Sequence, residues 1–394
     1  MDWKRQQELI PGGSQTRSKV GRFADNSPTT ANRGLGAHIW GDDGRKYLDY
    51  DMMLGAVLLG YNTSGPVKDA VLKQLERGSG FGLPSLLEGE LAELLLSFYP
   101  QHDMARFGKN GADATTAAIR LARAVTGKMG IAYSGYHGCA DWYEANGDNY
   151  KGIPRFNQTL AHEFEFNNLQ SLKDVLEGKR PKTPFDDGER IGAVIIEQPP
   201  ERPKEGFYSG LRKLCREHGV IWIQDEIVTG FRYAMGGAQE KYGFEADLTC
   251  VGKAMSNGLA ISALMGKKEH MMLFTKGVSW SSTFGGELTS IAGSIACIKE
   301  YSIGNLTYYT QELTNRLRDA LRPIVLDYAV VNGEGGRLIM TFNEERDRLR
   351  YMHYMHSRNI FINCRPIFIC MAHTEKHIER TIEISGDAIE SFNR

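Results

Sequence analysis

Three short apolar segments between residues 190 and 255 lead into an ionisable residue, and they recur at equal intervals. Glu197 ends AVIIE, Asp225 lies near the end of VIWIQDE, and Lys253 follows LTCVG. The interval is a comfortable length for one strand and the helix that returns the chain to the same edge of a sheet. The pattern therefore predicts neighbouring parallel strands, each delivering a polar side chain at its end.

The same alternation extends from about residue 60 to residue 300. IAYSG and SALMG are further short apolar strands, and helical segments lie between strands, such as SGLRKLCREHG, which Gly219 is expected to end. Alternating strands and helices predict an α/β fold with a mostly parallel central sheet and helices on both faces. In such sheets ligands bind beyond the carboxyl ends of the strands.

Lys253 and Asp225 are the side chains that most narrow the chemistry. A lysine amine and a carboxylate at one sheet edge are what pyridoxal phosphate requires, because the amine forms a Schiff base and the carboxylate keeps the pyridine nitrogen protonated. Taken singly, the alternatives are a solvated lysine and an aspartate that caps a helix or lies at the surface. Their placement after consecutive strands favours the cofactor.

A candidate phosphate site begins the helix of RFGKNGADATTAAIRLARAVTG, which Gly127 is expected to end. Its start near Asn110, Gly111 and Ala112 offers free amide groups and the positive end of the helix dipole. Thr283, in SWSSTFGGELTS, could supply a hydroxyl from a second loop. The alternative for both segments is an ordinary turn.

An aromatic loop follows the strand of IAYSGYHGCADWY and carries Tyr136 and His137. A planar cofactor needs an aromatic side chain on one face and an aliphatic one on the other, and we expect Tyr136 and Ile227 to fill these positions. The alternative for Tyr136 is a partly buried packing residue.

The two ends of the chain differ from its middle. AHIWGDDGRKYLDYD alternates around a turn at residues 42–44, and TQELTNRLRDALRPIV leads into a less regular α+β segment. We expect residues 1–55 to form an arm and hairpin of a small domain, 56–300 a large cofactor-binding α/β domain, and 301–394 the α+β remainder of the small domain.

Composition excludes several partners. The formal net charge of -1 gives no case for nucleic acid or an anionic membrane. No apolar run approaches the roughly 20 residues of a spanning helix, and MDWKRQQELIPGG lacks the apolar core of a secretion signal. Six cysteines without a CxxC pair indicate reduced thiols. We therefore expect a cytoplasmic protein that acts on small molecules without a metal site.

Five motifs occur in one order, namely FGKNGADATTAAIRLARAVTGK, GYHGCADW, IQDEIVTGFR, VGKAMSNG and STFGGE. Together they closely resemble class III pyridoxal phosphate aminotransferases, in particular the branch around glutamate-1-semialdehyde aminomutase. The resemblance runs from about Pro11 to the end of the chain. It implies the fold-type I architecture and an obligate homodimer whose active sites lie at the subunit interface.

The resemblance also implies roles for single residues around the cofactor ring. Lys253 would be the Schiff-base lysine and Asp225 the partner of the pyridine nitrogen. Tyr136 would stack on the ring with Ile227 on the opposite face, and His137 would lie beside the cofactor.

Further roles implied by the resemblance concern the cofactor's oxygen atoms. Gly111 and Ala112, after Asn110, match the phosphate-binding turn. Thr283 would reach the phosphate of the neighbouring subunit's cofactor, and Glu197 would lie near the phenolic oxygen.

Three departures from the aminomutase pattern bear on the substrate. Residues 110–113 read Asn-Gly-Ala-Asp where Ser-Gly-Thr-Glu is usual, residues 286–288 read Gly-Glu-Leu where Gly-Asn-Pro is usual, and PGGSQTRSK replaces PGGVNSPVR. These changes resemble relatives that aminate keto or aldehyde sugars in aminoglycoside and polysaccharide pathways. Candidate substrate residues, each with a surface or packing role as its alternative, are Arg17, Trp142, Arg232 and Glu287, and Lys19 and Arg365 are further possible pocket residues.

The function expected from these features is transamination in two half-reactions, from an amino donor such as glutamate to a carbonyl acceptor, which we expect to be a sugar. Lys253 would move the α-proton. One alternative is the aminomutase itself, which shifts an amine within glutamate 1-semialdehyde. A more remote alternative is a regulatory protein that binds the cofactor without turnover.

Overall fold

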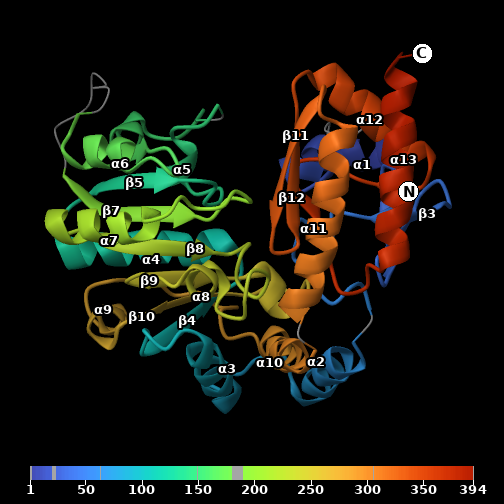
Figure 1. The fold of residues 1–394 in the computed structure, drawn as a ribbon. Helices are drawn as coiled ribbons and strands as arrows, with labels where there is room; N and C mark the ends of the chain where they lie inside the picture. The colour runs from blue at the N-terminus through green and yellow to red at the C-terminus, as the bar shows by residue number, and fades with distance from the viewer. Residues whose placement is uncertain are drawn as a thin grey trace. The chain divides into compact units, whose positions relative to one another are not determined.

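The computed structural model describes residues 2–19, 24–62, 64–148, 150–179, 190–304 and 306–393. The chain forms two compact units, which can be followed by colour in Figure 1. The larger unit is Pro66–Gly304, and the smaller combines Met1–Gly65 with Asn305–Arg394. The segment of alternating strands and helices thus folds as one body.

The larger unit is built on a seven-stranded sheet of order β4-β10-β9-β8-β7-β5-β6. Strands β9, β8, β7, β5 and β6 are parallel, whereas β10 runs antiparallel to both β9 and β4. The prediction of a mostly parallel α/β sheet is confirmed. The strands are β4 (Met104–Gly108), β5 (Gly130–Ser134), β6 (Ala161–Glu163), β7 (Ile191–Glu197), β8 (Ile221–Glu226), β9 (Leu248–Val251) and β10 (Ser262–Gly266).

Helices cover both faces of this sheet. Successive strand residues point to opposite faces, so the side chains on each face are buried against helices. On one face Ile195 and Ile223 pack in a cluster with residues of α4 (Gly111–Thr126). On the other, Val194 and Trp222 pack with residues of α6 (Leu169–Leu176) and α7 (Phe207–His218). Because both faces are buried, every residue of β7 is buried, which explains its unbroken apolar sequence.

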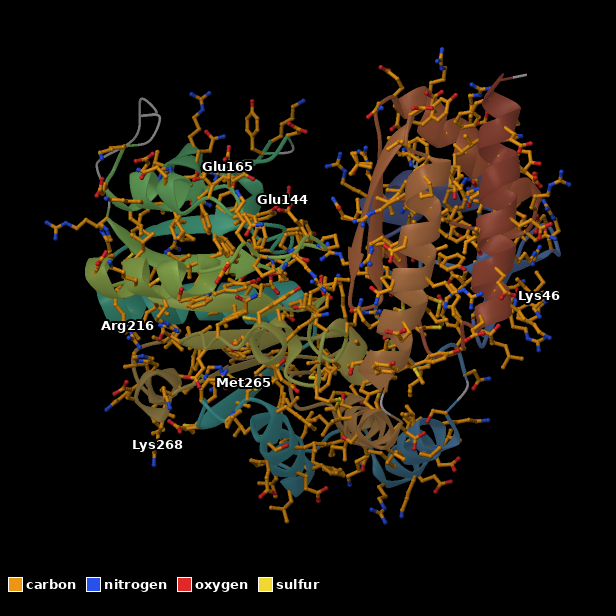
Figure 2. All side chains as sticks on the ribbon, in the orientation of Figure 1. Lys46, Glu144, Glu165, Arg216, Met265 and Lys268 are labelled. Carbon is orange, nitrogen blue, oxygen red and sulfur yellow. The ribbon has the colours of Figure 1, made fainter. Side chains whose placement is uncertain are left out.

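The predicted ends of two helices are confirmed. α4 ends at Gly127, whose φ is 67°, and α7 ends at Gly219, whose φ is 57°. Both glycines adopt the left-handed conformation that commonly terminates a helix. The remaining helices of the larger unit are α3 (Leu86–Phe98), α5 (Asp141–Glu144), α8 (Gly237–Tyr242), α9 (Lys268–Met271) and α10 (Leu288–Ile303), while α2 (Gly65–Arg77) begins at its boundary. Figure 2 marks Glu144 at the end of α5 and Met265 in β10.

The smaller unit joins the two ends of the chain through strand pairing. The hairpin of β2 (His38–Gly41) and β3 (Lys46–Asp49) forms as predicted, with Gly44 at a φ of 76° in its turn. β13 (Ile360–Phe361) adds to β3 in parallel. Other elements here are α1 (Trp3–Leu9), β1 (Ala31–Leu35), α11 (Leu306–Ile324), β11 (Ala329–Glu334), β12 (Arg337–Phe342), α12 (Glu345–Ser357), β14 (Ile367–Phe368) and α13 (Glu375–Glu390). Among the helices within the described ranges, none has the length and apolarity needed to cross a membrane.

Candidate active site

The carboxyl ends of β7, β8 and β9 meet at one edge of the seven-stranded sheet. Glu197, the last residue of β7, pairs with Asp225 of β8, which in turn pairs with Cys250 of β9. β9 ends at Val251, so Lys253 follows just beyond this register. The three ionisable residues therefore lie at the same edge, as their equal intervals in the sequence indicated.

Lys253 has a backbone conformation unusual for its residue type. Its φ is 44°, in the left-handed region, and it begins a 3-10 turn that runs Lys253–Ser256. A non-glycine residue in this region costs roughly 1–2 kcal/mol, so its surroundings must hold it there. The hydroxyl of Tyr301 in α10 donates to the carbonyl of Ala254 at 2.6 Å, which fixes the turn. Strained backbone of this kind clusters at functional sites.

Asp225 is held by two hydrogen bonds that orient its carboxylate. Oδ1 accepts from the backbone N–H of Ile227 at 3.0 Å, and Oδ2 lies 2.8 Å from Nδ1 of His137. The other ring nitrogen of His137 lies 3.2 Å from the carbonyl oxygen of Ser134. The side chains of His137 and Asp225 are 0% and 3% exposed. This buried pair fixes the direction in which the carboxylate can accept a further bond.

Ile227 contacts both the segment that carries the lysine and the start of α4. A Cβ on Gly111 would lie 2.9 Å from Cγ2 of Ile227, and a Cβ on Gly252 would lie 3.2 Å from its Cδ1. Glycine permits an approach here that a larger residue would hinder. The loop after β8, the residue before Lys253 and the first residue of α4 thus converge on one isoleucine.

The start of α4 presents unused backbone donors. Oδ2 of Asp113 accepts from the N–H groups of Lys109 and Asn110, each at 2.8 Å. Within the described ranges, the N–H groups of Gly111 and Ala112 donate to no other residue. Two such donors at the positive end of a helix fit a phosphate group.

Tyr136 stands in the loop after β5, where 59% of its surface is exposed. Its backbone N–H donates to Oε2 of Glu197 at 3.2 Å, which ties the loop to the end of β7. The ring of Tyr143 meets that of Tyr136 edge-on at 5.5 Å, and the Tyr143 hydroxyl donates to the carbonyl of Gly135 at 3.1 Å. Tyr143 thus supports the loop and the edge of the exposed Tyr136 ring.

The family model of the class-III aminotransferases matches residues 20–358 of this chain. The chain belongs to the class-III aminotransferases. It is a pyridoxal-phosphate-dependent transaminase of fold type I, and the resemblance stated from the motifs is confirmed.

Relatives of this aminotransferase carry more than one name. It is 36% identical over 344 residues to the glutamate-1-semialdehyde 2,1-aminomutase of Chloroflexus aggregans, covering 82% of this chain and 76% of the relative. The PLP internal aldimine form of the Sphingopyxis sp. MTA144 FumI protein superposes with a TM-score of 0.89 at 26% identity, covering 100% of this chain and 95% of that one. The glutamate-1-semialdehyde-aminomutase of Pseudomonas aeruginosa PAO1 has the same fold, with a TM-score of 0.84 at 20% identity over 98% and 93% of the two chains.

Two predicted residues of the aminotransferase lie in the loop before α10. Thr283 is exposed, whereas Glu287 is engaged in the fold. Glu287 caps α10 by accepting from the N–H groups of Thr289 and Ser290 at 2.9 and 3.0 Å, and Nζ of Lys109 lies 3.1 Å away. Burial opposes ionisation, but the bonds from Ser290, Thr289 and Lys109 outweigh it and lower the pKa of Glu287 to about 2. Its carboxylate thus has a structural role.

The other candidate substrate residues of the aminotransferase differ in burial. Arg232 is 0% and Trp142 7% exposed, and the indole Nε1 of Trp142 donates to the hydroxyl of Thr116 at 3.1 Å. The packing alternative therefore fits Trp142. Arg17 lies in the smaller unit, in an exposed 3-10 turn, Arg17–Lys19.

Glu226, directly after Asp225, is a buried carboxyl that sequence reasoning missed. It accepts from the backbone N–H groups of Ala238 and Gln239 at 2.9 and 3.0 Å, and from the hydroxyl of Thr229. Burial raises the pKa of Glu226 to about 7, against the lowering effect of these bonds. Glu226 thus ties the loop after β8 to the start of α8. Its only sequence signal was a second acidic residue at a strand end.

Proposed function

We propose that this transaminase transfers an amino group from glutamate to a keto or aldehyde acceptor, and that the acceptor is a sugar. The observation that supports the transfer chemistry is the convergence of Lys253, Asp225 and the start of α4 around Ile227. The sugar acceptor rests on the sequence departures at residues 110–113 and 286–288 and in the amino-terminal arm.

The residues present fit pyridoxal phosphate. The free N–H groups of Gly111 and Ala112 suit its phosphate, the carboxylate of Asp225 suits its pyridine nitrogen, and the amine of Lys253 suits its aldehyde. Tyr136 would cover one face of the ring and Ile227 the other. Asn110 and His137 belong to this shell, and Glu197 would lie near the phenolic oxygen.

The protein's own part in the reaction is positioning and proton transfer. When bound, pyridoxal phosphate supplies the electron sink that stabilises negative charge at the substrate's α-carbon. The Nζ of Lys253 would take the proton from the α-carbon of the donor and would return a proton to the corresponding carbon of the acceptor. Asp225, kept in place by Ile227 N–H and His137, keeps negative charge next to the pyridine nitrogen throughout.

We further propose a homodimer with shared active sites. The side chains of Phe81, Leu83, Leu86 and Phe284 are apolar and exposed, and the two segments that carry them are joined by a 2.8 Å hydrogen bond from the N–H of Leu288 to the carbonyl of Ser79. Leu86 is 90% exposed. An apolar surface of this kind favours burial against a second copy, where Thr283 would reach the phosphate in the partner's site.

The described cysteines are all free thiols, which supports a cytoplasmic location.

A second candidate is glutamate-1-semialdehyde 2,1-aminomutase activity. The observation that favours it is the name of the Chloroflexus aggregans relative, which this chain matches over most of both lengths. The two candidate activities would use the same cofactor residues. In transamination the amine moves to a second molecule, whereas in the aminomutase reaction it moves within one molecule.

The proposal is tested by following one half-reaction at a time. The purified enzyme with glutamate should lose the visible absorbance of lysine-bound cofactor and release 2-oxoglutarate, and a panel of keto and aldehyde sugars, free and nucleotide-linked, should restore it. Glutamate 1-semialdehyde is the comparison substrate. Formation of 5-aminolevulinate without net transfer from glutamate to any other carbonyl would establish the aminomutase instead. Absence of any spectral change with either substrate would overturn both.

A further inference from the structure

The hydrogen bonds of His137 specify where its protons lie. A carbonyl oxygen has no hydrogen, so the 3.2 Å contact between Nε2 and the Ser134 carbonyl requires that Nε2 carries a proton. Nδ1 lies 2.8 Å from Oδ2 of Asp225, and one proton must lie in that bond. The pair is therefore either an imidazolium with a carboxylate or an imidazole with a carboxylic acid.

Aromatic rings surround the imidazole on several sides. The indole of Trp142 stacks on it, with centroids 6.2 Å apart and an interplanar angle of 22°. Tyr143 and Tyr133 meet it edge-on at 5.6 and 6.4 Å. These rings pack around the buried imidazole and restrict the rotation of its ring.

Trp142 is itself fixed from α4, the helix that starts at the candidate phosphate site. Its Nε1 donates to the Thr116 hydroxyl at 3.1 Å, and the neighbouring Thr115 hydroxyl donates to the His137 carbonyl at 2.9 Å. One turn of α4 thus positions both the indole and the backbone of the histidine. Other ionisable groups near the pair are Cys250 and Glu226, which adjoin Asp225.

We propose that Trp142, held by Thr116, is a positioning residue that keeps the imidazole of His137 in its hydrogen bond with the carboxyl group of Asp225. The importance of this for catalysis rests on the proposed role of Asp225 at the pyridine nitrogen. Trp142 would then act through His137, without touching substrate, which replaces the substrate contact expected from the sequence.

The test uses graded variants and a matched control. Trp142→Phe keeps a ring for stacking but loses the indole N–H, Trp142→Leu loses both, and Thr116→Val removes only the acceptor. Trp222→Phe is the control, because Trp222 is a buried tryptophan of β8 that packs on the other face of the sheet, and its indole nitrogen has no hydrogen-bond partner among the described residues.

The first readout needs no cofactor. In cofactor-free protein with 15N-labelled histidine, a His137→Gln variant identifies the ring signals of His137 among the 10 histidines. At neutral pH the unaltered chain should show the signal of the proton in the bond between Nδ1 of His137 and Asp225. Trp142→Leu should weaken or lose this signal, Trp142→Phe and Thr116→Val should do so less, and Trp222→Phe should not.

The second readout is affinity for pyridoxal phosphate. Trp142→Leu should bind it about three- to tenfold more weakly than the unaltered chain, and Trp222→Phe with unchanged affinity. Trp142 variants indistinguishable from Trp222→Phe in both readouts would overturn the inference. If Asp225→Asn leaves the cofactor's absorbance and turnover unchanged while Trp142→Leu still alters His137, the proposed function fails and the positioning role stands.

Discussion

Among single residues, Asp225 has the most direct consequence for turnover. Asp225→Asn keeps the size of the side chain but removes the charge that we propose holds the pyridine nitrogen protonated, so kcat should fall by about a hundredfold or more. Steady-state kinetics with saturating cofactor measure this. Asp247→Asn is the control, because Asp247 precedes β9 at the opposite end and pairs with Arg212 at 2.8 Å. An equal loss in both variants would indicate a general effect on folding.

The close approach of Gly111 to Ile227 predicts the effect of a substitution at the phosphate end of the proposed site. The Cβ of Gly111→Ala would lie 2.9 Å from Ile227, so the start of α4 must shift and affinity for pyridoxal phosphate should fall about tenfold or more. Ile227→Ala removes the obstructing atoms. In that background the additional effect of Gly111→Ala should be much smaller. Strict additivity of the two effects, measured by titration of cofactor-free protein, would show that the contact is not the cause.

The sequence could predict Lys253 and Asp225 because each follows an apolar strand, and position at a strand end needs no knowledge of the whole sheet. It could not predict that His137 contacts Asp225. That contact depends on the order β8-β7-β5, which puts the loop after β5 near the end of β8. Strand order is set by packing across the sheet, and similar apolar strands carry little information about it.

Among the elements, the loop after β8 should make folding sensitive to pH through Glu226. The pKa of Glu226 is raised from 4.5 to about 7, so between these values the folded chain keeps a proton that the unfolded chain has lost. The free energy of unfolding should therefore fall as pH rises through this window, by up to about 3 kcal/mol. Urea unfolding of the cofactor-free protein at the two ends of the window measures the slope.

Glu226→Gln separates this contribution from those of other groups. The amide cannot ionise, so the variant should lose stability at every pH but show a flatter dependence across the window. An unchanged slope would mean that Glu226 is already ionised in the folded protein at low pH.

Helix ends and strands were predictable where a local rule decides them, as at Gly127 and Gly219. The direction of β10 was not, because SALMG is equally apolar in either orientation. Its antiparallel course follows from the short connection after Lys253, which returns the chain directly beside β9. The capping role of Glu287 was not predictable either, because the residues around it carry no sequence signal for the start of α10.

At the scale of the whole molecule, the proposed shared active sites predict complementation between two impaired chains. Lys253→Ala removes the proposed covalent anchor, and Thr283→Val removes the proposed contact with the partner's cofactor. In a mixed dimer one site would combine Lys253 from one chain with Thr283 from the other, so about half of the normal activity per dimer should return. Co-expression with two different affinity tags isolates this species, and assays at limiting cofactor reveal the effect of Thr283.

The controls for this experiment are the two parental dimers and Leu86→Glu. The charge in the exposed apolar surface should give monomers in sedimentation velocity and remove most activity. A mixed dimer no more active than the Thr283→Val parent, or a fully active monomer, would contradict the shared site.

The left-handed backbone at Lys253 has a further consequence. A lysine rarely adopts that conformation, whereas glycine would adopt it without strain. Selection for stability alone would therefore tend to remove the lysine from this position. A chain that no longer needed the amine would gain stability by replacing this lysine with glycine. The presence of the lysine therefore supports a chemical use of its amine.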